Sequence, residues 1–359
     1  MHIGNGATGQ DAAARAIGND AGVYVIAEIG VNHDGSAARA LELTDAAAAA
    51  GADAVKLQLF ATDMLMSKAA KLAAYQTAAG ETNPLAMLRR LELSLADMAL
   101  VVDRAHCQGI HAIVTVFSTE LVAGAETLAW DAYKSASPDI IHRPLLDAMA
   151  STAKPMIVST GASTIDEVLR AARWLEAARD RLALLQCVSS YPAPDAALEG
   201  IAAIARATGL PTGYSDHTPG AGSGARAVEH GACLLEKHLT YDVRAAGPDH
   251  AASLEPHAFA EYVSRAKAAT RGAAMAAGEK CLLECERDVR AVSRQSLTTR
   301  RALPAGHVLT ANDLTVKRPG TGIEPWRLEE VVGQRLVHDV EADALLRASD
   351  IMLAMHASL

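Results

Sequence analysis

The feature that most constrains the fold is an eightfold alternation of short apolar segments with longer helical patterns. Between residues 23 and 271, each apolar or β-branched run is followed by a stretch rich in Ala, Leu and Glu. Nearly continuous apolar runs of this length are typical of parallel strands buried on both faces. The eight runs are Val23–Ile29, Ala54–Leu59, Ala112–Val116, Ala132–Ser135, Met156–Ser159, Ala183–Cys187, Pro211–Tyr214 and Cys233–Glu236.

This alternation predicts an α/β fold of the (β/α)8 TIM-barrel type. Eight strand–helix units within about 250 residues are the usual content of such a barrel. A doubly wound open sheet is the alternative, but no glycine-rich dinucleotide-binding turn follows the first run. We therefore predict that residues 19–271 form a closed catalytic barrel.

The segments that flank the predicted barrel have a different pattern. Residues 1–18 are small and polar, which favours a loose, flexible arm, and residues 272–295 have mixed charge, as expected of a linker. Short β-like pieces separated by Gly and Pro then predict a compact, β-rich domain over residues 296–359. Its small size favours a role in dimerisation or as a lid.

Composition excludes several classes of function. The 359 residues have a net charge of −9 without a Lys/Arg-rich run, which argues against a nucleic-acid-binding protein. No apolar run approaches the length of a membrane span, and the first residues lack the apolar core of a signal peptide. Five cysteines without metal-binding spacing indicate free thiols in a reducing compartment. We expect a cytoplasmic protein that binds neither nucleic acid nor membrane.

Polar and charged residues gather where the predicted strands end. In a TIM barrel the carboxyl ends of the strands form the face that carries the active site, so these residues form one constellation. In chain order they include Glu28, Lys56, Gln58, Lys134, Ser137, Ser159, Ser189, Tyr191, Ser215, His217, Glu236 and His238.

Two lysines, Lys56 and Lys134, lie in apolar strand segments. An unpaired buried ammonium group is costly, so each must have an anionic partner. One interpretation is a structural ion pair with Glu28 or Glu236. The other is a phosphate or carboxylate ligand, which Ser137 and the hydroxyls and backbone N–H groups of the STGAS turn (Ser159–Ser163) would help to hold.

Two histidines predict a metal site. His217 and His238 follow the last two apolar runs, and parallel strands joined by a helix would bring both imidazoles to the same edge. Nearby carboxylates, Asp216 and Glu236, can orient the imidazoles. Two histidines that leave open positions suit Mn²⁺ or Mg²⁺, with Co²⁺ and Zn²⁺ as alternatives.

At these residues the sequence resembles the bacterial N-acetylneuraminate (sialic acid) synthase family. The resemblance covers about Ile17 to Ile351 in a consistent order. It rests on IAEIGVNHDGS, GADAVKLQLF, AYKSAS, STGAS, LLQCVSSYPAP, GYSDHT, EKHLT and GPDHAASLEP, and RRALPAGHVLTANDLTVKRPGTGI resembles the family's C-terminal antifreeze-like (SAF) domain.

The resemblance implies a metal-dependent condensation of phosphoenolpyruvate with an N-acyl amino sugar, which gives a nine-carbon sialic-type (nonulosonic) acid and phosphate. Lys134, Ser137, Ser159 and Ser215 would hold phosphoenolpyruvate, and His217 and His238 the metal. Glu28, Lys56, Gln58, Tyr191 and Asp249 would serve the sugar and the acid–base steps. We place Glu28, Lys56, Lys134, Glu236 and Asp249 in the catalytic group.

The resemblance also implies a domain-swapped homodimer. In the family the small domain crosses to the partner subunit, so Arg318 of the VKRPG segment would reach the neighbour's sugar. The alternative for Arg318 is a surface ion pair.

Several departures from the family pattern leave the acceptor sugar open. Ser189 stands where the family often has Asn, and Pro138-Asp139 replaces a usual Gly-Glu. The AAYQ segment (Ala73–Gln76) is closer to the sialic- and legionaminic-type members than to pseudaminic acid synthases. N-acetylmannosamine and 2,4-diacetamido sugars are the candidate acceptors. The alternatives are a related synthase for another aldehyde sugar and a non-catalytic sugar-binding homologue.

Overall fold

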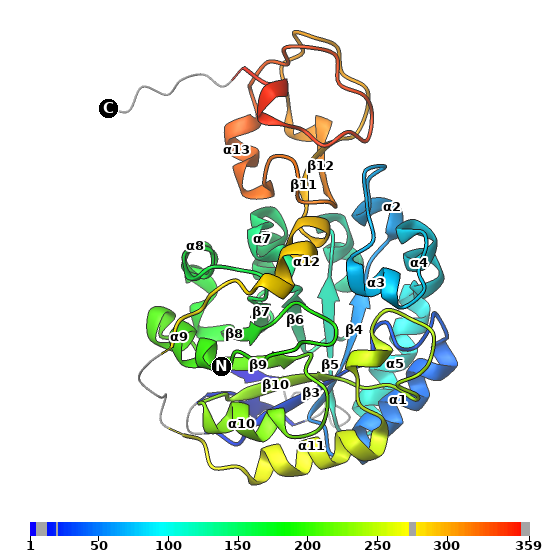
Figure 1. Cartoon of the computed structure of the whole chain (residues 1–359), viewed down its shortest axis with the longest axis vertical. Coiled ribbons are helices and arrows are strands. Elements are labelled where there is room, and N and C mark those ends of the chain that lie inside the picture. The colour runs from blue at the N-terminus through cyan, green and yellow to red at the C-terminus, as the bar shows by residue number, and fades with distance from the viewer. Residues whose placement is uncertain (5–12, 19–20, 273–277, 353–359) are drawn as a thin grey trace.

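The computed structural model describes residues 1–4, 13–18, 21–272 and 278–352, and its main body is a closed barrel of eight parallel strands (Figure 1). Around the barrel the strands follow the order β10-β3-β4-β5-β6-β7-β8-β9. The predicted TIM barrel is confirmed. The strands are β3 (Tyr24–Glu28), β4 (Ala54–Leu59), β5 (His111–Val116), β6 (Ala132–Ser135), β7 (Met156–Ser159), β8 (Leu182–Cys187), β9 (Thr212–Asp216) and β10 (Leu234–His238).

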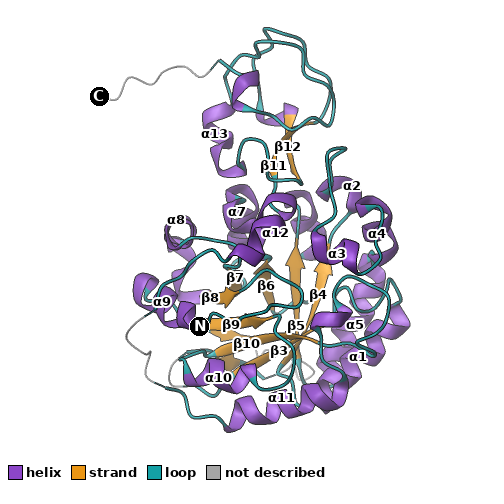
Figure 2. Cartoon of the chain, viewed as in Figure 1, coloured by secondary structure: helices purple, strands orange, loops and turns teal. Residues whose placement is uncertain are grey.

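Helices surround the barrel on its outer side (Figure 2). Local capping sets where several of them begin: Ser36 accepts from the backbone N–H of Arg39 at the start of α1, and Thr164 and Glu167 form a capping box on α8. The longer helices are α1 (Ala37–Ala49), α4 (Pro84–Leu91), α5 (Leu95–Cys107), α7 (Arg143–Ser151), α8 (Ile165–Trp174), α9 (Glu199–Thr208) and α11 (Pro256–Ala268), and the shorter ones are α2 (Thr62–Leu65), α3 (Ala74–Ala78), α6 (Val122–Ala125) and α10 (Ser223–Glu229).

Alternation along the strands separates the barrel interior from the helix-facing surface. The large cluster that packs with the helices includes Val25, Ala27, Val55 and Leu57. A second cluster in the barrel interior contains residues that alternate with these along the strands, such as Ile26 and Ala54. On six of the eight strands the inward residue two positions after this apolar layer is polar. The apolar layer therefore supports a polar one, in the pairs Ile26 and Glu28, Ala54 and Lys56, Ile113 and Thr115, Ala132 and Lys134, Ile157 and Ser159, and Leu234 and Glu236.

The described part of the N-terminal segment is packed, which corrects the expectation of a loose arm. Strands β1 (His2–Ile3) and β2 (Arg15–Ala16) pair in antiparallel fashion. Ile3 and Ile17 are 0% and 2% exposed and belong to the interior cluster. Apolar side chains in an otherwise small and polar segment thus close the amino end of the barrel. The arm's residues 5–12 lie outside the described residues.

The small C-terminal domain has a core of its own. Strands β11 (Ser296–Thr299) and β12 (Leu314–Lys317) pair in antiparallel fashion, and the short helix α13 (Leu328–Val331) follows. Ten buried residues, including Leu297, Leu314 and Leu346, form a cluster separate from the barrel core. The predicted compact domain is present over residues 296–352, and residues 353–359 lie outside the described chain.

The segment expected to be a linker contains secondary structure and buried charged residues. Residues 273–277 lie outside the description, but the rest contains a 3₁₀ turn (Glu284–Glu286) and helix α12 (Arg287–Ser293), which crosses the barrel mouth in Figure 1. Lys280, Glu286 and Arg294 are buried. The mixed charge of this segment therefore includes buried charged groups with partners in the barrel as well as exposed ones such as Glu284.

Two further expectations concern membranes and thiols. None of the described helices is long and apolar enough to cross a membrane. All five cysteines are free, as expected, including Cys281 and Cys285.

Candidate active site

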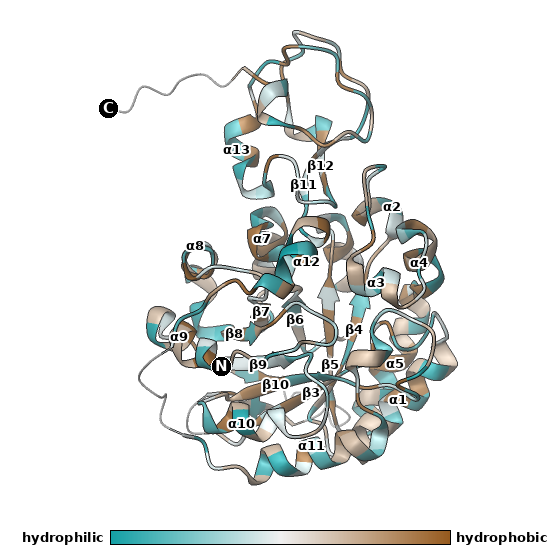
Figure 3. Ribbon diagram, in the orientation of Figure 1, coloured by the Kyte–Doolittle hydropathy of each residue, from teal (hydrophilic) through white to brown (hydrophobic). Residues whose placement is uncertain are grey.

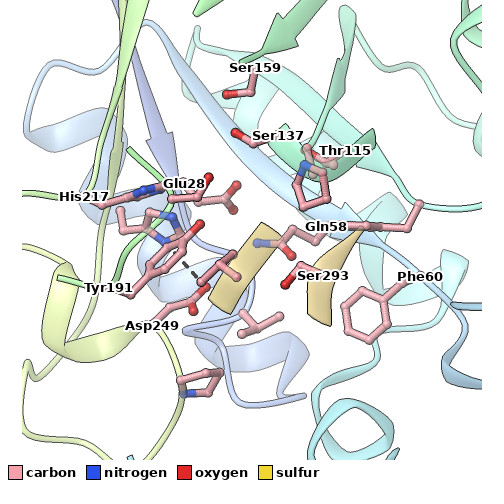
Figure 4. A pocket seen from close by; sticks show the side chains of 18 of the residues that line it. Glu28, Gln58, Phe60, Thr115, Ser137, Ser159, Tyr191, His217, Asp249 and Ser293 are labelled. Carbon is pink, nitrogen blue, oxygen red and sulfur yellow. Dashed lines mark ion pairs between the residues drawn. The ribbon is translucent and has the colours of Figure 1, made fainter. Parts of the chain in front are cut away.

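One pocket at the carboxyl ends of the barrel strands brings the predicted site residues together (Figure 4). Strands β3 to β10 and the loops that follow them supply most of its lining. All fourteen predicted site residues line this pocket: Glu28, Lys56, Gln58, Lys134, Ser137, Ser159, Ser189, Tyr191, Ser215, His217, Glu236, His238, Asp249 and Arg318. Thirteen of them lie together as the sequence predicts, whereas Arg318 was expected at the partner's site, and the individual roles of all fourteen stay predictions.

Two lysines and two glutamates form a buried ionic network at the base of the pocket. The Nζ atom of Lys56 contacts Glu28 directly and lies 3.6 Å from Glu236, and Lys134 Nζ lies 3.3 Å from the same Glu236 carboxylate. Burial alone would raise the pKa of Glu236, but the charges of Lys134 and Lys56 lower it to about 2. The structural ion pairs that the sequence left open are present, within a pocket that a ligand can enter.

Further hydrogen bonds hold this network in place. Lys56 donates to the hydroxyl of Thr115 at 2.9 Å, and the hydroxyl of Ser215 donates to Glu236 at 2.8 Å. The backbone N–H of Gly30 donates to Glu28 at 2.7 Å. Burial lowers the pKa of Lys56 to about 7, against the opposing charge of Glu236. Lys56 and Glu28 thus place an ammonium group and a carboxylate in direct contact inside the pocket.

Serine hydroxyls gather on another side of the pocket, where Figure 4 shows Ser137 and Ser159 close to each other. The hydroxyl of Ser159 is buried and has no hydrogen-bond partner among the described residues. Gly161 lies between Ser137 and Ser189, where a Cβ atom would come within 2.8 Å and 2.2 Å of their hydroxyl oxygens. Close packing of three loops therefore directs these hydroxyls to one place, as an oxyanion requires.

The backbone N–H groups of the STGAS turn are used within the protein, which corrects the expectation that they bind the anion. Thr160 donates to the carbonyl of Leu185, Gly161 to Ser137, and Ala162 to Glu286, at 3.0, 3.0 and 2.6 Å. An anion at this place must be held mainly by side-chain hydroxyls and by Lys134.

The two histidines fit a divalent metal ion as part of its ligand set. Their ring centroids are 5.5 Å apart, and Nδ1 of His217 lies 2.8 Å from the carbonyl of Val188. Since a carbonyl only accepts, Nδ1 carries the proton and Nε2 is left for a metal. Burial, and then the charge of His217, lowers the pKa of His238 well below its ordinary value, which favours the neutral imidazole that metals bind.

A metal at this place would need ligands beyond the protein. Among the residues of the described ranges, no group of three or more His, Cys, Asp or Glu is arranged to hold a metal ion. Asp249 is the nearest carboxylate, 3.8 Å from Nδ1 of His238. Two imidazoles with open positions suit an ion that completes its coordination with substrate or water oxygens.

Aromatic rings close the histidine side of the pocket. The ring of Tyr191 lies against His217, with centroids 4.0 Å apart, and Tyr75 stacks on Tyr191 at 4.8 Å. Asp249 is buried beside them, and burial raises its pKa to about 6, against the charges of His217 and Lys56. This side therefore combines apolar walls with a few polar groups, as is usual where a sugar binds.

Arg318 lines the pocket of its own chain, whereas the resemblance implied that it reaches the partner's site. Backbone hydrogen bonds attach it to the long loop after β4: Arg318 donates to Leu65 at 2.9 Å, and Ser67 donates back to Arg318 at 3.1 Å. Its guanidinium lies 5.6 Å from the ring centroid of Phe117. The surface ion pair is thereby replaced by a half-buried cation at the pocket wall.

Some lining residues were missed by the sequence reasoning. Thr115 is the inward residue of β5, two positions after Ile113, and the alternation along the strand could have identified it. Val289 and Ser293 come from helix α12, for which no sequence pattern pointed to the pocket. The long insertion after β4 contributes Leu65, Tyr75 and Gln76.

One departure from the family pattern lies behind the pocket. Pro138 lines the pocket, but Asp139 is fully buried and accepts a hydrogen bond from the side chain of Gln295 at 2.8 Å. Burial raises the pKa of Asp139 to about 7, although the charge of Arg318, the hydrogen bond from Gln295 and the charge of Lys134 oppose the shift. This acid is thus held in its neutral form over most of the acidic range.

A closed barrel with buried charges and histidines at the carboxyl ends of its strands, covered by a second small domain, defines an enzyme of the TIM-barrel class. The chain belongs to the NeuB family, whose model matches residues 43–280, and a SAF domain matches residues 294–352.

Similar proteins cover nearly the whole chain. It is 38% identical to the N,N'-diacetyllegionaminic acid synthase of Legionella pneumophila, over 90% of this chain and 93% of the relative. It is 28% identical to the pseudaminic acid synthase of Helicobacter pylori, over 91% and 97%. The crystal structure of a spore coat polysaccharide biosynthesis protein from Bacillus subtilis superposes with a TM-score of 0.79 at 29% identity, covering 95% and 98% of the two chains.

The raised pKa of Asp139 predicts a defined pH dependence of stability. Between about pH 4 and 7 the unfolded chain has released this proton and the folded protein has not, so Asp139 lowers the free energy of unfolding as the pH rises through that window. Asp139→Asn does not titrate. Its stability relative to wild type should therefore increase across the window and stay constant above it.

Urea unfolding at several pH values checks this expectation. Asp180→Asn, which alters an exposed carboxylate, is the matched control and should show little change across the window. A difference between Asp139→Asn and wild type that is equal at all pH values would contradict the assignment.

Proposed function

We propose that this protein condenses phosphoenolpyruvate with the open-chain aldehyde of an N-acylated amino sugar, which yields a nine-carbon 2-keto acid and phosphate. The observation that carries the proposal is the division of a single pocket. Ser137 and Ser159 lie together on one side and His217 and Asp249 on another (Figure 4), His238 lies next to Asp249, and Lys134 in the same lining is paired with Glu236. Membership of the NeuB family, with relatives named as synthases of such acids, supports it.

The reaction needs one new carbon–carbon bond and one broken carbon–oxygen bond. The CH2 carbon of phosphoenolpyruvate attacks the aldehyde carbon, and the aldehyde oxygen gains a proton to become a hydroxyl group. Water then adds to the cationic carbon that bears the phosphate. That carbon becomes a ketone when its bond to the phosphate oxygen breaks, and the two protons of the water end on the new hydroxyl and on the phosphate.

The side chains of the pocket supply charge and proton handling for these changes. Lys134, with Ser137, Ser159, Ser189 and Ser215, holds the phosphoenolpyruvate anion, because cationic and hydroxyl donors stabilise oxyanions in a site that excludes water. The contact between Lys56 and Glu28 provides a proton donor and acceptor next to each other. Gln58, Tyr191, Asp249 and Arg318 orient the sugar.

Arrival of the anion redistributes the charges of the buried network. Lys134 is shared with Glu236, and Lys56 with both Glu28 and Glu236. A phosphate near Lys134 competes with Glu236 for that ammonium group, which leaves Glu236 with Lys56. Both lysine ammonium groups near the anion site are therefore already ion-paired before the substrate binds.

His217 and His238 are the residues that would hold a divalent ion, with Mn²⁺ or Mg²⁺ favoured by their open coordination positions. When bound, such an ion polarises the aldehyde carbonyl as a Lewis acid. Val188 fixes the proton of His217 on Nδ1, and Tyr191 packs against its ring, so that both hold the imidazole in one orientation.

Among the candidate acceptors, a 2,4-diacetamido hexose is favoured over N-acetylmannosamine. The identity of 38% to a synthase named for a diacetylated acid exceeds the 30% to the N-acetylneuraminate-9-phosphate synthase of Homo sapiens, whose named product carries a single N-acetyl group. The domain-swapped homodimer and the cytoplasmic location stay predictions.

Phosphate release tests the proposed reaction. We expect release with phosphoenolpyruvate, Mn²⁺ and a 2,4-diacetamido hexose, less with N-acetylmannosamine, and none without acceptor, since the carbon–oxygen bond breaks only after the addition step. Mass spectrometry identifies the nine-carbon product. Absence of release with every N-acylated amino sugar would refute the proposal, and Glu28→Gln serves as the inactive control.

Removal of either histidine tests the metal proposal. His217→Ala and His238→Ala should each reduce turnover at least about a hundredfold and weaken Mn²⁺ binding in isothermal titration, because each removes one of two protein ligands. His257→Ala, an exposed substitution on α11, is the control and should leave both unchanged. Turnover that persists in both variants after treatment with EDTA would rule out the metal.

A further inference from the structure

The segment Lys280–Arg294, here called the connecting segment, lies between the barrel and the small domain and covers part of the pocket. Its helix α12 is mainly hydrophilic in Figure 3, yet it contributes Val289 and Ser293 to the pocket lining. Figure 4 shows Ser293 among the side chains that line the pocket. A polar helix at this place needs polar partners in the barrel, and the contacts of Glu286, Arg290 and Arg294 supply them.

Glu286 joins two loops of the barrel to the connecting segment. Its side chain is 0% exposed. One carboxylate oxygen accepts the backbone N–H of Ala162 at 2.6 Å and that of Ser189 at 2.7 Å. The other oxygen accepts the N–H of Leu283 at 3.0 Å. A single buried carboxylate therefore holds the turn after β7 and the loop after β8 at a fixed separation.

Two arginines hold the same turn from its other side. The carbonyl of Ala162 accepts hydrogen bonds from Arg290 and Arg294, and both guanidinium groups pair with Glu167, the capping residue of α8. Ala162 has a φ of 50°, in the left-handed region that costs energy for a residue other than glycine. Both backbone polar groups of Ala162 are thus bound by the connecting segment, which keeps it in this conformation.

The residues next to Ala162 and Ser189 carry the hydroxyls of the anion side. Gly161 donates to Ser137 at 3.0 Å, and the unpartnered hydroxyl of Ser159 precedes it by two residues. A shift of the turn would displace Ser159 from Ser137 and from the side chain of Ser189, which lies 2.2 Å from the position of a Cβ on Gly161. The placement of three anion-binding hydroxyls therefore depends on Glu286.

The connecting segment also touches the loop that carries Arg318. The backbone N–H of Gly320 donates to the carbonyl of Ala291 at 3.0 Å, and Arg294 lies 3.8 Å from Glu324 of the small domain. These contacts are made through the opposite end of α12 from Glu286. Arg294 also binds the carbonyl of Ala162 and so supports both sides, whereas the contacts of Glu286 to the barrel are to the two loops of the anion side. A change at Glu286 should therefore act first on the anion side.

We propose that Glu286 is a positioning residue for phosphoenolpyruvate: it sets the geometry of the Ser137, Ser159 and Ser189 hydroxyls without touching the substrate. This inference rests on the proposed function. It assigns a binding role to a segment that lies mostly outside both the NeuB match, which ends at residue 280, and the SAF match, which begins at residue 294.

Titration of the full-length protein with phosphoenolpyruvate, and separately with inorganic phosphate, tests the role of Glu286. Each lost hydrogen bond to a carboxylate is worth roughly a tenfold change, so Glu286→Ala should weaken binding of phosphoenolpyruvate about tenfold or more. The KM for phosphoenolpyruvate should rise by a similar factor, while the KM for the acceptor sugar should change less than about threefold.

Two further variants separate positioning from folding. Glu286→Gln keeps one acceptor oxygen for Ala162 and Ser189 and should restore most of the affinity, so it also serves if Glu286→Ala does not fold. Glu284→Gln is the matched control, because Glu284 is exposed on the same segment and pairs with Arg287. It should leave both KM values unchanged.

The outcomes distinguish failure of the inference from failure of the proposed function. Wild-type protein that binds phosphoenolpyruvate, together with a folded Glu286→Ala that binds it equally well, overturns the positioning role alone. An equal rise of both KM values, or Glu286→Gln that is as impaired as Glu286→Ala, indicates a general structural role and also overturns it. Wild-type protein that binds neither phosphoenolpyruvate nor phosphate refutes the proposed function, and the inference with it.

Discussion

The rest of the site depends on one constraint, the burial of two ammonium groups and two carboxylates at the mouth of a closed barrel. Lys56, Lys134, Glu28 and Glu236 are each at most 5% exposed and lie on four strands, of which β10, β3 and β4 are neighbours. No one of these charges could be buried alone, since an unpaired charge in an apolar interior costs several kcal/mol. Barrel closure brings β10 beside β3, which places Glu236 between both lysines.

The sequence predicted the barrel and its site well because both follow from local patterns. Apolar runs identified all eight strands to within a few residues, and the polar residue at each strand end was directed to one face by the parallel arrangement. Features that depend on pairing between distant segments were not predictable in this way. Three contacts join residues that are far apart in the sequence and share no local pattern. They are the packing of Ile3 at the end of the barrel, the hydrogen bond of Arg318 to Leu65 and the hydrogen bond of Ala162 to Glu286.

The anion side shows how such distant contacts change a prediction. From the sequence, the STGAS turn before a helix indicated an anion site to which both its hydroxyls and its backbone N–H groups contribute. In the structure, the carboxylate of Glu286 accepts the N–H groups of Ala162 and Ser189. The hydroxyls of Thr160 and Ser163 are also used within the protein, and that of Ser159 remains for the ligand. Side-chain hydroxyls rather than backbone N–H groups are therefore the donors available to an anion in this pocket. Their number depends on the presence of a serine at position 189.

The connecting segment places the functional boundary between the two domains later in the chain than composition suggests. Residues 280–294 are held to the barrel by hydrogen bonds and ion pairs of Glu286, Arg290 and Arg294, whereas the core of the small domain begins at Leu297. In a chimera with a relative, a junction near residue 272 would transfer these residues away from the loops they hold. A junction just before Ser296 would exchange the small domain and leave each barrel with its own support.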